Sequence, residues 1–199
     1  MQTEIHPFKL WMPSNARLLM LGTFPPAPKR WCMEWYYPNF QNDMWRIFGL
    51  VFFGDKQHFV LNQEHTFDLP ALKNFLAQTG IAIFDTALQI QRTKGTASDK
   101  DLKIVKQADI DAMLNQLPNC TDVLTAGQLA TRVFTTHLGI TSTPPMGGNV
   151  SFNYGNRPMR LWRMPSSSRA YPLAVEKKAA YYAEMFSQVF GSGISKLNE

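Results

Sequence analysis

One stretch, residues 17–45, restricts the fold of this chain more than any other, because it reads as a strand, a loop and a helix in succession. It begins with the apolar run Leu18–Leu21, breaks at Gly22 into a proline-rich loop, passes through a group of aromatic residues and enters a helix near Asn42. In an open α/β sheet such a unit forms the ligand crevice, because strand ends face it and the next helix offers unpaired N–H groups. The loop has no glycine-rich phosphate-binding motif, so the sequence does not support a nucleotide cofactor.

Strand and helix signals alternate along the rest of the chain. An N-capping Asp68 and a terminal Gly80 predict a helix, and a short apolar strand that ends in Asp85 follows it at once. Residues 89–101 are polar and contain glycine, which predicts a loop. The other expected elements are helices at about 109–117, after Gly127 and from Pro172, a strand at 122–125, and a hairpin at 150–154 and 159–164. This alternation predicts an α/β protein, a three-layer α/β/α sandwich with a central, mostly parallel, four-stranded sheet.

The four predicted parallel strands should bring their carboxyl ends to one edge of the sheet. These ends are Gly22, Asp85, Ala126 and Pro165. Ligands of open α/β sheets bind at this edge, so we expect the functional residues here.

Length and composition suit one globular domain. We expect it to span residues 1–199, with an N-terminal arm at 1–15 that packs Phe8 and Trp11 on the domain, and a loose tail at 192–199. The apolar runs are too short to span a bilayer and the first residues lack a signal-peptide pattern, so the expected compartment is the cytoplasm. Cys32 and Cys120 form no C-x-x-C, which favours free thiols, and the histidines lack metal-ligand spacing. We therefore expect neither a metal nor a cofactor.

Basic residues exceed acidic residues by a modest margin. The formal net charge is +5, which by itself favours an anionic partner only slightly. The positions of the basic residues are more informative than their number. One late segment holds Arg157, Arg160, Arg163 and Arg169. The first loop holds Lys29 and Arg30. If the two segments meet in the fold, they form a basic rim around one crevice.

Five motifs in order resemble those of the uracil-DNA glycosylase superfamily. They read LGTFPPAP, WYYPNFQNDMW, GIAIFDTALQIQR with Ser98 and Asp99 downstream, VLTAGQLA and MPSSSRA. The chain resembles most the branch that includes the mismatch-specific and hypoxanthine-DNA glycosylases. The similarity runs from Arg17 to about Tyr182, and it implies the fold of that superfamily.

The resemblance implies a role for each matched residue. Asn42 and Asp85 take the catalytic positions, Asn42 as the asparagine of the N-x-F-W run and Asp85 as the strand-end residue that reads the base edge. The base pocket would be lined by Gly22, Thr23, Phe24, Pro25, Tyr37 and Asn39. The DNA backbone would contact Pro165, Ser166, Ser167, Ser168 and Arg169.

Two positions depart from the family pattern. Phe24 stands where several branches have a water-activating Asp or Asn, and Met164 stands where others have His or Asn before Pro-Ser. The hypoxanthine branch also lacks the water-activating Asp or Asn, so Phe24 at this position is compatible with glycosylase activity.

The residues alone leave simpler interpretations open. Asp85 and Asn42 can each cap a helix, and Ser166–Ser168 can form a loop and a cap before Pro172. Trp45 fits a buried helix face by its spacing. His6, like the other histidines, is interpreted as an ordinary residue.

The resemblance therefore implies a monofunctional DNA glycosylase that flips out a deaminated base, such as uracil or hypoxanthine, and hydrolyses its glycosidic bond in base excision repair. Its partner would be DNA with a damaged or mismatched base, bound by a monomer. One alternative is a DNA-binding protein that keeps the fold without the chemistry. Another is a hydrolase of free nucleotides or nucleosides.

Overall fold

We describe a computed structural model of the chain, in which residues 2–93 and 101–191 are placed. The predicted tail at 192–199 and the pair Ser98 and Asp99 lie outside the described residues. The strands are β1 Thr3–Ile5, β2 Leu18–Gly22, β3 Val60–Leu61, β4 Thr66–Phe67, β5 Ile81–Asp85, β6 Ala87–Arg92, β7 Leu102–Gln107, β8 Asp122–Ala126, β9 Asn149–Tyr154 and β10 Arg157–Met164. The helices are η1 Pro28–Arg30, a 3-10 turn, and α1 Met44–Phe53, α2 Leu69–Thr79, α3 Ile110–Gln116, α4 Gln128–Leu138 and α5 Val175–Phe190.

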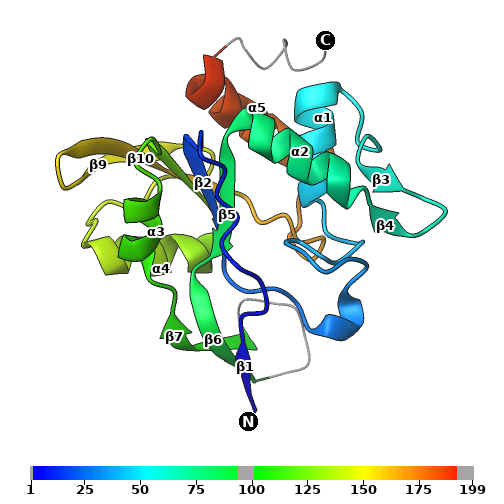
Figure 1. Ribbon diagram of the computed structural model, residues 1–199, viewed down its shortest axis with the longest axis horizontal. Helices are drawn as coiled ribbons and strands as arrows, with labels where there is room; N and C mark the ends of the chain where they lie inside the picture. Colours follow the sequence, from blue (N-terminus) through cyan, green and yellow to red (C-terminus); the bar gives the residue numbers. More distant parts are fainter. Residues whose placement is uncertain (1, 94–100, 192–199) are drawn as a thin grey trace.

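A central sheet with the strand order β5-β2-β8-β10-β9 organises the molecule (Figure 1). Its first four strands are parallel, and β9 pairs antiparallel with β10 through the predicted hairpin. The sheet is therefore five-stranded rather than four-stranded, because the hairpin adds β9 to its edge. Strands β2, β5 and β8 are buried along their whole length, as expected of parallel strands that are covered on both faces.

Helices cover both faces of this sheet. Helices α1, α2 and α5 lie together on one side, and α3 and α4 lie on the other (Figure 1). The first group meets through aromatic rings: Phe52 of α1 lies 4.7 Å from Phe75 of α2 and 4.8 Å from Phe186 of α5, centroid to centroid. The predicted caps are confirmed, since the Asp68 carboxylate accepts from the Ala71 N–H at 3.0 Å and Gly80 ends α2 with φ of 74°. The three-layer α/β/α prediction is thus correct.

A second sheet, with the order β1-β6-β7, extends below the central one (Figure 1). The prediction of a loop at residues 89–101 was wrong for residues 89–92, which belong to β6 and pair with β7 and with β1 of the arm, and residues 94–100 lie outside the described residues. These strands alternate only weakly between apolar and polar residues. Their pairing depends on backbone hydrogen bonds to the distant arm, which the local sequence does not reveal.

The N-terminal arm runs along the outer edge of the central sheet. Its Trp11 exchanges two backbone hydrogen bonds with Ile83 of β5, at 3.1 and 2.9 Å. The predicted packing of the arm is confirmed, because Trp11 contacts the Trp35 ring at 5.6 Å and Phe8 contacts the Trp31 ring at 5.1 Å. The arm is therefore joined to both sheets.

Candidate functional site

The carboxyl ends of the parallel strands meet at one edge, as predicted. In the strand register Gly22 lies opposite Asp85, Leu21 opposite Thr125, and Met164 opposite Ala126. No helix follows Asp85, because the chain turns through Thr86 into β6, so the helix-cap interpretation of Asp85 was wrong. The Asp85 carboxylate is instead buried at this edge, with 6% of the residue exposed.

Gly22, Asp85 and Tyr37 converge on one point. A Cβ atom at Gly22 would overlap Asp85 Oδ1 and would lie 3.3 Å from the Tyr37 hydroxyl oxygen. Only glycine fits between these two groups without displacing them. Three of the predicted site residues are therefore side by side, although they are far apart in the sequence.

Tyr37 has an unusual backbone conformation. Its φ of 50° lies in the left-handed region, which costs energy for a bulky residue and which recurs at functional sites. Its ring meets Trp45 edge-on, with 5.8 Å between the centroids. Trp45 is itself fully buried, as its helical spacing predicted. A rigid core thus supports the strained Tyr37.

Asp85 has a partner that the sequence analysis did not identify. His6 Nε2 lies 2.9 Å from Asp85 Oδ2, and the two side chains are 1% and 9% exposed. On the other side of the ring, Nδ1 lies 3.0 Å from the Phe8 carbonyl oxygen and 3.2 Å from the Phe8 N–H nitrogen. The interpretation of His6 as an ordinary residue was wrong.

Aromatic rings surround the His6–Asp85 pair. Phe24 meets the His6 ring edge-on at 5.4 Å, and Phe84 lies 4.7 Å away. The Arg92 guanidinium lies 5.8 Å from the Phe24 centroid, and it donates to the Pro25 carbonyl oxygen at 2.7 Å. Burial, and then the nearby Asp85 charge, raise the pKa of Tyr36, so its hydroxyl stays protonated and donates to the Lys9 carbonyl oxygen. The buried His6–Asp85 pair is thus enclosed by aromatic rings.

The remaining residues predicted for the pocket belong to the two loops beside it. Thr23 is buried, and its carbonyl oxygen accepts from the Ala87 N–H at 3.1 Å. Asn39 Oδ1 accepts from the Gln41 N–H at 2.9 Å in a turn. Both residues therefore shape the backbone that flanks the site.

Asn42 lies one residue before Asp43, the N-cap of α1, so the interpretation of Asn42 as the N-cap was off by one residue. Its Oδ1 accepts from the Met44 N–H at 2.9 Å, which leaves the Nδ2 donors for another partner. Among the described contacts, no hydrogen bond joins Asn42 to Asp85. Asn42 is thus positioned by the start of α1, whereas Asp85 is positioned by the end of β5.

The loop Pro165–Arg169 lies against the start of α1. The Asp43 N–H donates to the Ser167 carbonyl oxygen at 3.0 Å. The Asp43 carboxylate contacts Arg169 Nε at 3.2 Å and Lys178 Nζ at 2.9 Å. Lys178 is fully buried and also donates to the Ser168 carbonyl oxygen at 2.8 Å. The sequence analysis missed Asp43 and Lys178, which tie this loop to α1 and α5.

The other residues of this loop are fixed in place as well. The Tyr182 hydroxyl donates to the Pro165 carbonyl oxygen at 3.0 Å. The Ser166 and Ser168 hydroxyls each accept from a backbone N–H two residues further along, at 3.2 Å. The loop interpretation of these serines is confirmed, but the cap interpretation was wrong, because α5 begins at Val175 with Ala174 as its N-cap and no side-chain cap.

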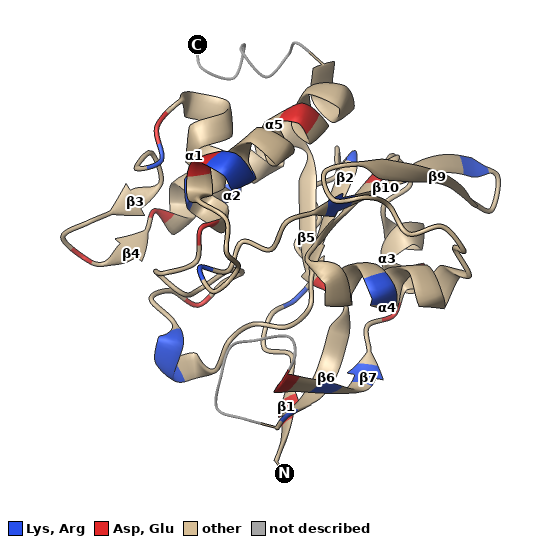
Figure 2. Cartoon of the chain, turned by 180° about the vertical axis from the view of Figure 1, so that it is seen from behind, with Lys and Arg blue, Asp and Glu red and all other residues tan. Residues whose placement is uncertain are grey.

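The predicted basic rim does not form as expected. Arg157 and Arg160 lie at the start of β10, where Arg160 pairs with Asp122, the first residue of β8. This is the opposite end of the sheet from Asp85, whereas Arg163 lies opposite Thr125 near the carboxyl ends of the strands, and Arg169 contacts Asp43. Figure 2 shows Lys and Arg spread over many elements rather than gathered on one face.

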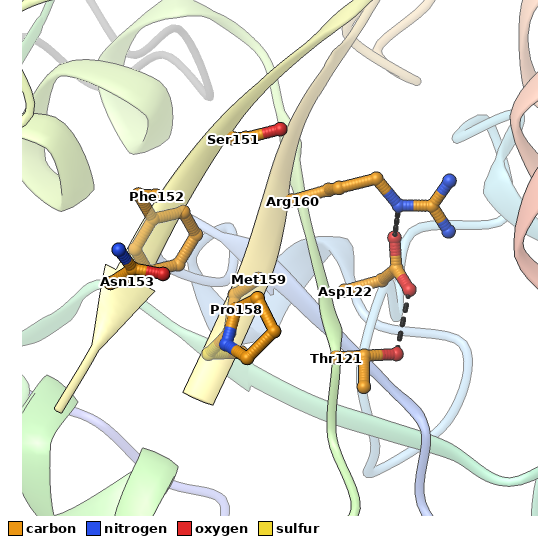
Figure 3. Close-up of a pocket in the computed structure, with 8 residues that line it drawn as sticks. All are labelled: Thr121, Asp122, Ser151, Phe152, Asn153, Pro158, Met159 and Arg160. Atoms are coloured by element: carbon orange, nitrogen blue, oxygen red, sulfur yellow. Dashed lines mark hydrogen bonds and ion pairs between the residues drawn. The ribbon is translucent and has the colours of Figure 1, made fainter. Parts of the chain in front are cut away.

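Two hollows lie elsewhere on the described residues, and neither has Asp85 in its lining. One of about 370 Å³ is lined by Asp43, Arg46, Lys56 and Arg169, and it adjoins the Pro165–Arg169 loop. The other, of about 270 Å³, lies at the amino-terminal end of the parallel strands, where Asp122 accepts from Arg160 and Thr121 (Figure 3). The cations of the first hollow are partly neutralised, because Lys56 pairs with Glu176 at 3.1 Å and Arg169 with Asp43 at 3.2 Å.

Within the described residues, no helix is long and apolar enough to cross a membrane. No group of three or more His, Cys, Asp or Glu side chains in the same residues could hold a metal ion.

The fold is a uracil-DNA glycosylase-like α/β/α sandwich. A solution NMR structure of a candidate uracil DNA glycosylase from Methanosarcina acetivorans is similar, with a TM-score of 0.58 and 18% sequence identity. The similarity covers 92% of this chain and 99% of that chain. At this identity the likeness shows the fold alone, and it agrees with the superfamily that the motifs resemble. The chain matches no protein-family model and no curated protein.

Proposed function

We propose that this protein is a monofunctional DNA glycosylase that excises a deaminated base, such as uracil or hypoxanthine, from DNA. The observation that carries the proposal is the buried Asp85 carboxylate beside Gly22 and Tyr37, at the ligand edge of a uracil-DNA glycosylase-like fold. The five ordered motifs of the sequence support the same activity. A repair role and the mismatch-specific or hypoxanthine branch belong to this proposal.

The proposed reaction breaks the bond between the sugar C1′ atom and a base nitrogen. Positive charge grows on the sugar and negative charge on the departing base, so a site must supply donors to the base and a positioned water. The free Nδ2 group of Asn42 is one such donor. Asp85 accepts from a base N–H or orients the water, whose oxygen bonds to C1′ while its proton balances the base anion.

The target base must first leave the helical stack, which costs a few kcal/mol. The rings of Phe24 and Tyr37 offset this cost by packing on the extruded base. The Pro165–Arg169 loop then binds the flanking phosphates, with Arg169 exposed and its Nε within 3.2 Å of Asp43. The exposed Arg169 is the cation of that loop that supports DNA as the partner, because Arg46 is buried and Lys56 pairs with Glu176.

Excision assays on single-lesion oligonucleotides test this proposal. Purified protein is incubated with duplexes that carry one uracil, one hypoxanthine or no lesion, and abasic sites are cleaved with alkali. We expect a lesion-dependent product, and a loss of at least about 100-fold in rate for Asp85→Ala and for Asn42→Ala.

Asp111→Ala is the matched control, because Asp111 also pairs with a histidine, His137, at 2.7 Å, but on the surface. It should leave excision unchanged. Absence of product on every lesion, with DNA binding intact, would contradict the proposal and favour a DNA-binding protein of the same fold. If Asp85→Ala and Asn42→Ala both excised the base at the normal rate, the glycosylase activity would stand but the catalytic roles of Asp85 and Asn42 would be refuted.

A further inference from the structure

The second sheet has one face toward the solvent. The register of β1, β6 and β7 places six residues on this face, because opposed residues of antiparallel strands point to the same side. We call it the outer face, and its two rows are Thr3, Gln91 and Lys103, and Ile5, Gln89 and Lys106. The residues contributed by β1 and β7 are exposed, and the two glutamines of β6 are half-buried.

A β-bulge aims both lysines at the outer face. Lys103 and Lys106 are three residues apart, so in a regular strand, whose side chains alternate, they would point to opposite faces. The pairing with β6 skips Val105, which is therefore an extra, bulged residue. The extra residue turns Lys106 to the same face as Lys103.

The outer face carries positive charge without an acidic residue. Its two lysines are its charged groups, and Figure 2 shows basic residues on β7. Glu4 of β1 lies on the opposite face, where its carboxylate accepts from Arg92 Nε at 2.8 Å. The Gln91 amide donates to the Thr3 hydroxyl at 3.2 Å, so polar groups continue between the strands. Ammonium, amide and hydroxyl groups are the side-chain groups that bind the phosphate oxygens of DNA.

Hydrogen bonds hold the second sheet to the candidate site. Strand β6 begins two residues after Asp85, and the N–H of its first residue, Ala87, donates to the Thr23 carbonyl oxygen at 3.1 Å. Further along β6, Arg92 donates to the Pro25 carbonyl oxygen at 2.7 Å. Figure 1 shows the second sheet continuing from the carboxyl end of β5. The outer face is therefore fixed relative to the ligand edge.

The two lysines lie at a distance from this edge that suits the flank of a bound duplex. At about 3.3 Å per residue, their partners Gln89 and Gln91 lie about 7 and 13 Å beyond Ala87. Successive phosphates of one DNA strand advance about 3.4 Å along the helix axis. A duplex with its target base at the strand ends would thus offer the lysines phosphates roughly two to four base pairs away.

We infer that the outer face of the second sheet binds the phosphate backbone of duplex DNA on one side of the target base, through Lys103 and Lys106. This inference rests on the proposed function and adds a second contact surface to the Pro165–Arg169 loop. Phosphate contacts carry no base information, so the outer face should add the same affinity for damaged and undamaged DNA. It should also steepen the salt dependence of binding, since each phosphate contact releases counter-ions.

Fluorescence anisotropy of labelled duplexes at a series of salt concentrations tests the inference. The purified full chain is compared with the double variant Lys103→Gln/Lys106→Gln, on a duplex with one central uracil and on an undamaged duplex. We expect the affinity at about 0.1 M salt to fall at least about 10-fold on both duplexes. The slope of log K against log salt concentration should become shallower by about 2.

Lys73→Gln is the control variant, because Lys73 lies in the middle of α2 with its ammonium 5.6 Å from the Trp35 ring centroid. It should change neither the affinity nor the slope. An unchanged slope in the folded double variant, or no binding of either duplex by the unmodified protein, would overturn the inference.

Shortened duplexes locate the contact. Two duplexes end about two base pairs from the uracil, one on each side. Loss of the contacted flank should weaken binding by the unmodified protein to the level of the double variant, and should leave the double variant unaffected. Loss of the other flank should weaken both proteins by the same factor. If the double variant were weaker than the unmodified protein by one constant factor on all duplexes, a contact to one flank would be refuted.

This inference and the proposed function fail in different ways. Excision of uracil together with an unchanged salt slope in the double variant would keep the glycosylase and refute the outer face. Absence of excision on every lesion, together with a shallower slope in the double variant, would refute the glycosylase and keep the DNA-binding face.

Discussion

Removal of the Asp43 carboxylate is expected to destabilise the protein strongly. Lys178 is fully buried, and its ammonium group has the Asp43 carboxylate at 2.9 Å and the Ser168 carbonyl oxygen at 2.8 Å as partners. In Asp43→Ala the ammonium would keep only the carbonyl. Arg169, the other cation on Asp43, has a side chain that is 53% exposed and can turn to water.

The loss of folding stability depends on which buried charge loses its counter-ion. Breaking a buried pair by deleting one partner costs about 3–5 kcal/mol, because the other charge remains in the interior. For a protein of this length this corresponds to a fall in Tm of about 6–20 °C. Lys178→Met should cost only about 1–2 kcal/mol, since Asp43 keeps Arg169 as a partner.

Urea unfolding of the single variants and of the double variant tests this reasoning. Asp43→Ala with Lys178→Met should be more stable than Asp43→Ala alone, because no unpaired ammonium remains. Asp111→Ala, at an exposed pair, should cost less than about 1 kcal/mol. If Asp43→Ala cost no more than Lys178→Met, or if the two costs simply added, the coupling argued here would be refuted.

Two further predictions concern the sheet edge and the core. Gly22→Ala should slow excision in the oligonucleotide assay, because the added methyl overlaps Asp85 Oδ1; a normal rate would show that Oδ1 does not face the base. Burial raises the pKa of Cys120 from 9.0 to about 11. The unfolded thiol ionises first, so the contribution of Cys120 to stability should be constant below about pH 8.5 and fall by about 2–3 kcal/mol as the pH rises to about 11. Urea unfolding of Cys120→Ala should show a smaller fall, and an equal fall would contradict the shift.

Elements with local signals could be predicted from the sequence. Helix α2 was predicted from its capping Asp68 and its terminal Gly80, since a cap and a left-handed glycine act within one turn of the chain. The buried parallel strands were predicted because they are continuous apolar runs. The α/β/α architecture and its ligand edge follow from these elements in order.

Strands that depend on distant partners could not be predicted. Strand β6 carries polar residues such as Gln89 and Gln91, and its pattern does not alternate clearly. It is a strand because β1, more than eighty residues away, and β7 supply its hydrogen bonds. The width of the central sheet was underestimated for a related reason, because β9 was predicted as half of a hairpin rather than as an edge strand.

The residues of the candidate site also divide into those with a local sequence signal and those without one. Asp85, Gly22 and Asn42 were identified because strand ends and helix starts have sequence signals, and the family resemblance named the same positions. Lys178 was missed, because a lysine in an amphipathic helix is usually on the solvated face. Its burial follows from Asp43, which no pattern links to it.

His6 shows why the arm must be counted as part of the site. Two backbone pairings, β1 with β6 on one side and Trp11 with Ile83 on the other, hold the chain on both sides of His6. The His6 N–H itself donates to the Leu88 carbonyl oxygen at 2.8 Å. Because backbone groups do this positioning, almost any arm side chains that allow strand pairing would bring His6 to Asp85. The second sheet therefore supports the contact between the His6 ring nitrogen and a carboxylate 79 residues away.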